Sequence, residues 1–137
     1  MPSTAFNPAL VTINVVTTYL PSHSQPENDQ FTFAYTITIS NASDLPVQLL
    51  SRHWVITDAD ENVQEVKGDG VIGEQPIIYP DDAFQYTSGA TINTPVGYME
   101  GSYFMVVREP MEIDPQELPT FEVPIPAFSL HTPTALN

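Results

Sequence analysis

The segment Phe31–Ser40 reads FTFAYTITIS, and a large apolar residue occupies every second position, with Thr, Ala or Ser between. Side chains of a β-strand point to opposite faces at successive residues, so this alternation is typical of a strand with one buried face. The face predicted to be buried carries Phe31, Phe33, Tyr35, Ile37 and Ile39. These residues predict that Phe31–Ser40 lies at the core of an all-β domain.

The same alternation appears on both sides of this segment, in Val11–Tyr19 and in Met99–Val107. Val47–Thr57 is apolar on both faces, which indicates a strand in the middle of a sheet. The polar stretch Asp58–Asn62 follows it and predicts a hairpin turn. Shorter candidate strands, each bounded by Pro, Gly, Asp or Asn, are Val63–Lys67, Ile77–Tyr79, Ala83–Ser88, Phe121–Ile125 and Phe128–Leu130.

The prolines indicate how these strands are joined. There are 14 of them, about twice the usual share, and they are predicted to separate the strands and to exclude long helices. The sequence therefore predicts a β-sandwich of the immunoglobulin or fibronectin type III kind with seven or eight short strands, and a closed barrel stays as the alternative. We expect a single domain over residues 11–131, with tails at 1–10 and 132–137.

Composition limits the classes of partner. The chain of 137 residues has no cysteine, and 3 basic against 17 acidic residues give a net charge of −14. Such a charge repels nucleic acid and anionic membranes, whose binding requires several cationic contacts. Neither a secretory signal nor a membrane-spanning apolar run is visible, so we expect a soluble, cytoplasmic protein.

Catalytic and metal-binding patterns are weak. Ser51 and His53 share a strand face, but side-by-side residues rarely form the aligned nucleophile, base and acid of acyl transfer. His23, His53 and His131 lack the spacing of a zinc site. Asp58 and Asp60 resemble the start of a calcium loop that lacks its glycine and glutamate, which leaves weak divalent cation binding as an alternative to a hairpin turn. We expect no enzyme activity and no cofactor.

A glycine-rich stretch, Gly68–Gly73, reads GDGVIG and matches the GxGxxG pattern of dinucleotide-binding loops. In those loops a helix follows and its N-terminus binds the pyrophosphate. Here Glu74, Gln75 and Pro76 follow instead, and no helix is expected. We therefore interpret the glycines as residues that allow unusual backbone conformations.

Arg52 is one of the few basic residues and lies inside an apolar stretch. A charge in such a place requires a carboxylate or a cluster of carbonyl groups. We expect an ion pair with Glu65 across the predicted hairpin, and the alternative is contact with a partner or an anion.

Several motifs resemble, in order and over about residues 11–130, the ApaG family. They are LLSRHW at Leu49–Trp54, QEV at Gln64–Val66, GDGVIGEQP at Gly68–Pro76, YTSG at Tyr86–Gly89, TPVG at Thr94–Gly97 and MEGSYFM at Met99–Met105. The resemblance implies a fibronectin type III-like sandwich. It also implies a protein, also called CorD in bacteria, that is linked to cobalt tolerance and magnesium efflux, and whose eukaryotic relatives use the domain as an interaction module. Asp81, where the family usually has glycine, and the long segment Arg108–Thr120 depart from the family pattern.

Two functional hypotheses follow. In the first, the chain is a non-enzymatic protein-interaction module associated with divalent cation efflux or tolerance. In the second, it binds a small ligand, a divalent cation or a phosphate compound, at the glycine-rich loop. Both hypotheses use the same candidate residues, namely Arg52, His53, Gly68, Gly70, Gly73, Glu74 and Gln75. The sequence predicts another protein as the partner and leaves homo-oligomers open.

Overall fold

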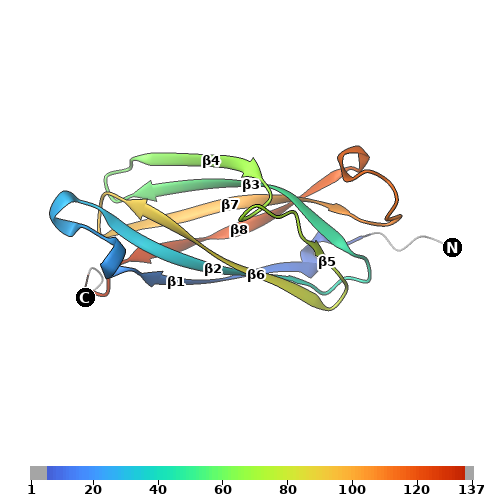
Figure 1. Ribbon diagram of the computed structural model, residues 1–137, viewed down its shortest axis with the longest axis horizontal. Helices are drawn as coiled ribbons and strands as arrows, with labels where there is room; N and C mark the ends of the chain where they lie inside the picture. Colours follow the sequence, from blue (N-terminus) through green and yellow to red (C-terminus); the bar gives the residue numbers. More distant parts are fainter. Residues whose placement is uncertain (1–5, 135–137) are drawn as a thin grey trace.

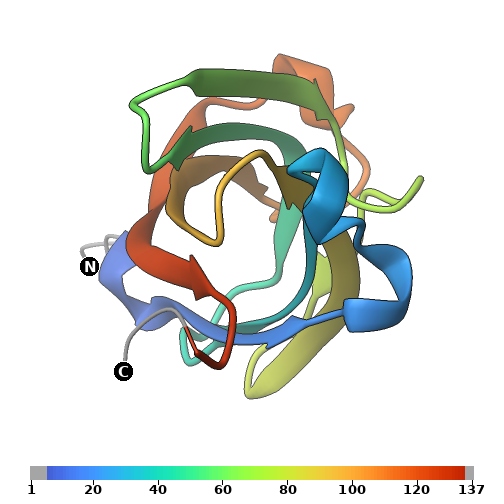
Figure 2. The same cartoon turned by 90° about the vertical axis from the view of Figure 1, so that its left-hand side faces the viewer.

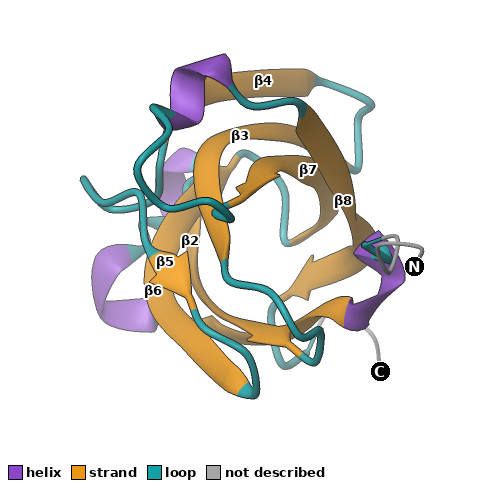
Figure 3. Ribbon diagram, turned by 90° about the vertical axis from the view of Figure 1, so that its right-hand side faces the viewer, coloured by secondary structure: helices purple, strands orange, loops and turns teal. Residues whose placement is uncertain are grey.

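The computed structural model describes residues 6–134, and these form eight β-strands and four short 3₁₀ turns with no α-helix (Figure 3). Six of the strands have nine or more residues, and four of these contain the clearest alternating or apolar runs of the sequence. The strands are β1 (Val11–Tyr19), β2 (Phe31–Asn41), β3 (Val47–Asp58), β4 (Val63–Asp69), β5 (Ile77–Ile78), β6 (Asp82–Ile92), β7 (Val96–Val107) and β8 (Thr120–His131). The turns are η1 (Pro8–Leu10), η2 (Pro21–His23), η3 (Pro26–Asn28) and η4 (Pro115–Glu117).

The strands form two antiparallel sheets that face each other (Figures 1 and 2). One sheet has the order β1-β2-β6, and the other has the order β4-β3-β7-β8, with β5 paired to the start of β3. The immunoglobulin or fibronectin type III-like sandwich predicted from the sequence is thereby confirmed, with eight strands. The barrel alternative is not what the chain adopts.

The strand β2 lies in the middle of its sheet, with β1 and β6 on its two sides. Phe33, Ile37 and Ile39 are fully buried, as the alternation in FTFAYTITIS predicts. They pack against Trp54, Met99 and Tyr103 of the other sheet within one hydrophobic cluster. The apolar face of β2 is therefore the centre of the core.

The strand β3 is central, as its apolar residues on both faces predict, but its pattern has an irregularity. Its pairing with β7 shifts register between Leu49 and Ser51. A bulge of this kind adds one residue to one strand and rotates the following side chains. As a consequence the neighbours Leu49 and Leu50 are both buried, although successive residues of a regular strand face opposite sides.

The last strand differs from the prediction. The sequence predicts two short strands, Phe121–Ile125 and Phe128–Leu130, but the structure has one continuous strand, β8. The prolines Pro124 and Pro126 lie inside it. Since β8 is an edge strand, a missing N–H costs little on its open side. Proline therefore does not end a strand at this position.

The loop before β6 has a residue other than glycine in a left-handed conformation, at the position where the sequence departs from the family pattern. Asp81 has a φ of 62°, and its N–H donates to the carbonyl of Asn41 at 2.8 Å. A left-handed backbone favours glycine, and aspartate is among the residues that tolerate it.

The ends of the domain lie close to the sheets. Residues 6–10 of the predicted N-terminal tail include the turn η1, and the ring of Phe6 packs against Phe121 at 4.8 Å between ring centroids. The first five and the last three residues of the predicted tails lie outside the described residues. Within residues 6–134 no helix has the length and apolar character that a membrane crossing requires.

Candidate functional site

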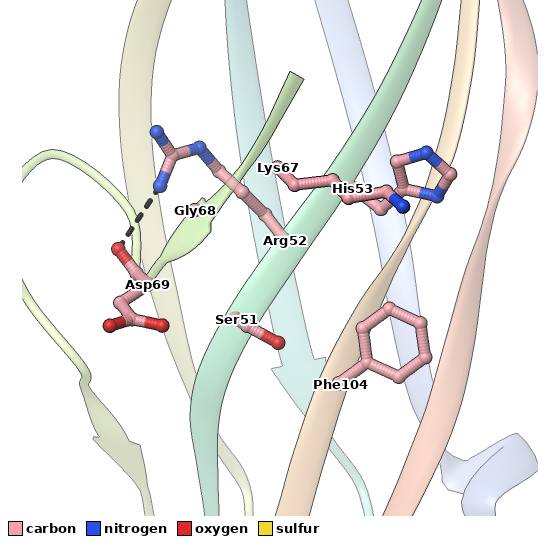
Figure 4. Close-up of a pocket in the computed structure, with 7 residues that line it drawn as sticks. All are labelled: Ser51, Arg52, His53, Lys67, Gly68, Asp69 and Phe104. Atoms are coloured by element: carbon pink, nitrogen blue, oxygen red, sulfur yellow. Dashed lines mark hydrogen bonds between the residues drawn. The ribbon is translucent and has the colours of Figure 1, made fainter. Parts of the chain in front are cut away.

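The hairpin of β3 and β4 brings most of the predicted site residues together. Its register places Arg52 opposite Gly68. The guanidinium lies against Gly68 and donates from Nη1 to the carbonyl oxygens of Asp69 at 3.0 Å and Gly70 at 2.8 Å (Figure 4). A Cβ atom at Gly68 would lie 2.9 Å from that Nη1. A larger residue at position 68 would therefore displace the guanidinium from this place.

The predicted ion pair between Arg52 and Glu65 is wrong. Glu65 pairs instead with His53, whose Nε2 lies 2.8 Å from Oε2 of the glutamate. Glu65 is opposite Val55 in the hairpin, so it shares a face with His53, two residues away, and not with Arg52, three residues away. The carbonyl cluster, which the sequence also allowed, satisfies Arg52.

The environment of Glu65 favours its charged form. The hydrogen bond with His53 is the main cause that holds the pKa of Glu65 below its usual range, and the positive charge of Lys67 acts in the same direction. Glu65 is therefore a carboxylate at neutral pH. With Lys67 and His53 it forms a mixed-charge group on the outer face of the sheet.

The glycine-rich stretch ends in a tight turn. Val71 and Glu74 exchange two backbone hydrogen bonds, of 2.8 and 2.9 Å. The two residues between them, Ile72 and Gly73, have φ values of 43° and 80°, which are typical of a type I′ turn. Gly70, just before the turn, has a φ of 62°, and a Cβ atom there would lie 2.1 Å from the carbonyl oxygen of Glu74. Both Gly70 and Gly73 thus have conformational roles.

Ile72 is a site residue that the sequence analysis missed. Its side chain is 55% exposed, and its backbone is left-handed, a conformation in which a β-branched residue is an outlier. Asparagine or glycine is the usual residue at this position of a type I′ turn. The signal in the sequence is therefore the pair Ile-Gly where Asn-Gly is expected.

Two glutamines fasten the turn to β3. The side chain of Gln75 donates to the carbonyl of Leu50 at 2.9 Å, and the side chain of Gln48 donates to the carbonyl of Gln75 at 2.9 Å. Glu74 is exposed beside the turn. The loop from Gly70 to Gln75, hereafter the glycine loop, is therefore a fixed projection with Ile72 and Glu74 at its exposed tip.

The outer face of β3, β4 and β7 has a surface depression of about 450 Å³, lined by Ser51, Arg52, His53, Lys67, Gly68, Asp69 and Phe104. Figure 4 shows His53 and Phe104 on one side of β3, while Arg52 extends in another direction toward Asp69. Within residues 6–134 Ser51 and His53 form no hydrogen bond with each other, and Nε2 of His53 is held by Glu65. The pair accordingly lacks the line of groups that a nucleophilic serine needs.

The acidic turn Asp58–Asn62 is a hairpin turn, as predicted. Both carboxylate oxygens of Asp58 accept hydrogen bonds inside the turn, from the N–H groups of Asp60 and Asn62 and from the side chain of Asn62. Burial by itself would raise the pKa of Asp58, but these hydrogen bonds hold it below its usual range. Within residues 6–134 no three His, Asp or Glu side chains are arranged to hold a metal ion.

Comparisons with known proteins agree with the architecture. A family model described as the ApaG domain matches residues 21–107. The protein ApaG of Ralstonia nicotianae is 52% identical over 93% of this chain and 96% of its own length, and that of Acidithiobacillus ferrooxidans is 49% identical over 95% and 96%. A crystal structure from Bordetella pertussis superimposes with a TM-score of 0.82 at 43% identity and covers 91% of this chain and 95% of its own. The chain therefore belongs to the ApaG family.

Proposed function

We propose that the chain is a non-enzymatic protein-interaction module that supports divalent cation tolerance, and that the glycine loop is its docking surface. The link to cations rests on the association of the family with cobalt tolerance and magnesium efflux. The choice of a protein as the ligand rests on the structure of the loop.

The observation that carries this proposal is the exposure of Ile72 together with its left-handed backbone conformation. A large apolar side chain is 55% exposed at the tip of a turn, on a backbone that disfavours it. Local strain of this kind costs of order 1–3 kcal/mol and is concentrated at sites of recognition. A rigid apolar tip beside the carboxylate of Glu74 fits an apolar pocket with a basic rim on another protein.

The hydrogen bonds of the loop support a protein ligand over a phosphate. A pyrophosphate site needs several backbone N–H groups that point toward the ligand. The N–H groups of Gly70, Val71 and Glu74 already donate to the carbonyls of Leu50, Glu74 and Val71. The charges of Asp69 and Glu74 oppose a phosphate as well.

The proposal predicts opposite effects of Ile72→Asn on stability and on function. Asparagine removes the strain of the type I′ turn, so the midpoint of thermal unfolding should rise, with a gain of about 1 kcal/mol. Cells in which this variant replaces the natural chain should nevertheless lose cobalt tolerance, because the apolar anchor is absent. Growth in cobalt and thermal unfolding measure the two effects.

The matched control is Val16→Asn, which removes an apolar side chain that is 57% exposed on β1, in the other sheet. It should leave cobalt tolerance unchanged. Glu74→Lys provides a second loop variant, in which the charge is reversed and the turn is retained. Wild-type tolerance in folded Ile72→Asn and Glu74→Lys would place the docking surface elsewhere.

A small ligand, either a phosphate compound or a divalent cation, is the second candidate. The depression on the outer face favours the phosphate compound, since its size suits a small molecule and Lys67 supplies a positive charge. Calorimetry with ATP and with cobalt and magnesium salts tests this candidate. Binding of ATP that is weakened by Lys67→Ala and unaffected by Ile72→Asn would favour it over the docking loop.

A further inference from the structure

The strand β4 is an open edge of the five-stranded sheet. Among the described residues its one strand neighbour is β3, and Figure 1 shows it along the top of the molecule. Its apolar residues Val63 and Val66 are 61% and 38% exposed. The opposite edge of this sheet, β8, contains prolines that remove backbone donors, whereas β4 contains none. An open edge of this length presents backbone groups that can pair with a further strand.

The hydrogen bonds to β3 show which backbone groups of β4 point outward. At the two ends of the hairpin, the N–H of Gly70 donates to Leu50 at 2.8 Å, and the carbonyl of Asn62 accepts from Asp58 at 3.0 Å. In an antiparallel pair every second residue bonds to the neighbour. Even-numbered residues of β4 therefore face β3, and Val63, Glu65, Lys67 and Asp69 direct their N–H and C=O groups away from it.

We propose that β4 is a self-association edge, which pairs antiparallel with β4 of a second copy about a two-fold axis at Val66. In such a pair, residues whose N–H and C=O groups point outward must lie opposite residues of the same kind in the second copy. The two-fold axis must therefore pass through a residue, not through the peptide bond between two residues. Three centres near the middle of the strand are available, at Glu65, Val66 and Lys67.

Charge selects among the three centres. A centre at Glu65 or Lys67 places that residue opposite itself, with like charges in direct contact, which is unfavourable. A centre at Val66 places Glu65 of each copy opposite Lys67 of the other. The sequence Glu-Val-Lys thus complements itself only in this register, and the backbone groups of both charged residues become paired.

Val66, on the face of β4 opposite to Glu65 and Lys67, supports the same register. Val66 would lie opposite Val66 of the second copy, at a position without backbone bonds where side chains approach most closely. Its exposed surface would then be covered. The carbonyl of Asp69 already accepts from Arg52, so Glu65 and Lys67 contribute the main part of the new ladder. This pairing does not depend on the glycine loop as a docking surface.

Sedimentation equilibrium over a series of concentrations tests the proposal. The salt concentration should be about 0.15 M, at which the repulsion between two copies of net charge −14 is largely screened. The wild type should approach the dimer mass as concentration rises. Lys67→Glu and Glu65→Lys should each weaken association at least about tenfold, because every opposite-charge pair becomes a like-charge pair.

Mixing the two variants is the decisive measurement. A Lys67→Glu copy carries two glutamates at these positions and a Glu65→Lys copy carries two lysines, so the mixture should recover the dimer that each lacks alone. Glu100→Lys is the matched control for charge, since Glu100 is exposed on the same face of the inner strand β7, and it should leave association unchanged. Melting curves verify that every variant is folded.

Amide hydrogen exchange locates the contact. The N–H groups of Glu65 and Lys67 should become protected as concentration rises, whereas those of Gln64 and Val66, which face β3, should be protected throughout. A wild type that remains monomeric up to its solubility limit overturns the proposal. A mixture that fails to recover the dimer, or protection confined to another strand, overturns it as well.

Discussion

Arg52 shows how one charged residue can organise a loop from inside a sheet. Its guanidinium crosses β4 at Gly68 and donates to two carbonyl groups where that strand ends. Hydrogen bonds from a charged donor contribute more than neutral ones, about 1.5–3 kcal/mol each. Arg52 and Gly68 are thus expected to act as one unit that holds the base of the glycine loop.

A double-mutant cycle tests this unit. Arg52→Ala leaves the carbonyls of Asp69 and Gly70 without their donor and should lower the free energy of unfolding by about 1–3 kcal/mol. Gly68→Ala displaces the guanidinium and should cost a similar amount. In the Arg52→Ala background the alanine at 68 should cost little, because no guanidinium remains to be displaced. Additive losses in urea unfolding would show that the two residues act separately.

At the scale of the element, the glycine loop depends on two glycines for different reasons. Position 70 requires glycine for two reasons: its φ is positive, and a Cβ atom would lie only 2.1 Å from the carbonyl oxygen of Glu74. Gly73 has only the conformational requirement, since nothing lies within 4 Å of its Cβ position. The two glycines of one motif should therefore respond differently to the same change.

Alanine at each position measures this difference. Gly73→Ala should cost about 1 kcal/mol, the penalty for an L-residue with positive φ. Gly70→Ala should cost more, because the turn must move to relieve the overlap. Thermal unfolding of the two variants, side by side, gives the comparison. Equal losses would mean that the loop relaxes freely around Gly70.

The elements also show how far the sequence predicts the structure. The alternation in FTFAYTITIS predicts β2 and the centre of the core, because a period of two places all the large apolar side chains on one face of a strand, and that face must be buried. Prolines were misleading in β8, where an edge strand tolerates them. The partner of Arg52 could not be predicted, since it depends on which face of β3 each residue occupies and on loop carbonyls that no side-chain pattern reveals.

The candidate site was predicted in part. The sequence grouped the glycines, Arg52 and His53; Arg52, His53 and Gly68 line one depression, although the side chains of Arg52 and His53 leave β3 in different directions (Figure 4). Ile72 was passed over because an apolar residue between glycines resembles a core residue. Its exposure depends on the turn geometry, and that geometry appears only when the pairing of Val71 with Glu74 is known.

For the whole molecule, a buried hydrogen bond links the two sheets. The hydroxyl groups of Tyr86 in β6 and Tyr103 in β7 bond to each other in the core, where the residues are 5% and 0% exposed. Each hydroxyl satisfies the other away from water. Burial is the main cause that raises the pKa of both, that of Tyr86 to about 12.

This raised pKa predicts alkaline destabilisation. Above pH 10.0 the unfolded chain releases the Tyr86 proton while the folded chain keeps it up to about pH 12, so the contribution of Tyr86, complete below pH 10.0, should be lost across this range. Tyr86→Phe should remove its share of the pH dependence and cost about 1–3 kcal/mol at neutral pH, since Tyr103 loses its partner. Adding Tyr103→Phe should restore part of that loss. Melting temperatures from pH 9 to pH 12 check both effects; a flat wild-type profile would contradict them.

The strand order has a consequence for synthesis on the ribosome. The middle strands β2 and β3 end by Asp58, but their later neighbours β6 and β7 are complete only at Val107. At about 5–20 residues per second, the nascent chain therefore exposes two half-paired strands for seconds before the sandwich can close. The three-stranded sheet has all its strands once β6 ends at Ile92, whereas the five-stranded sheet awaits β8, which ends at His131. A chaperone that acts on nascent chains would meet its target in this interval, and the apolar face of β2 is the surface it would shield.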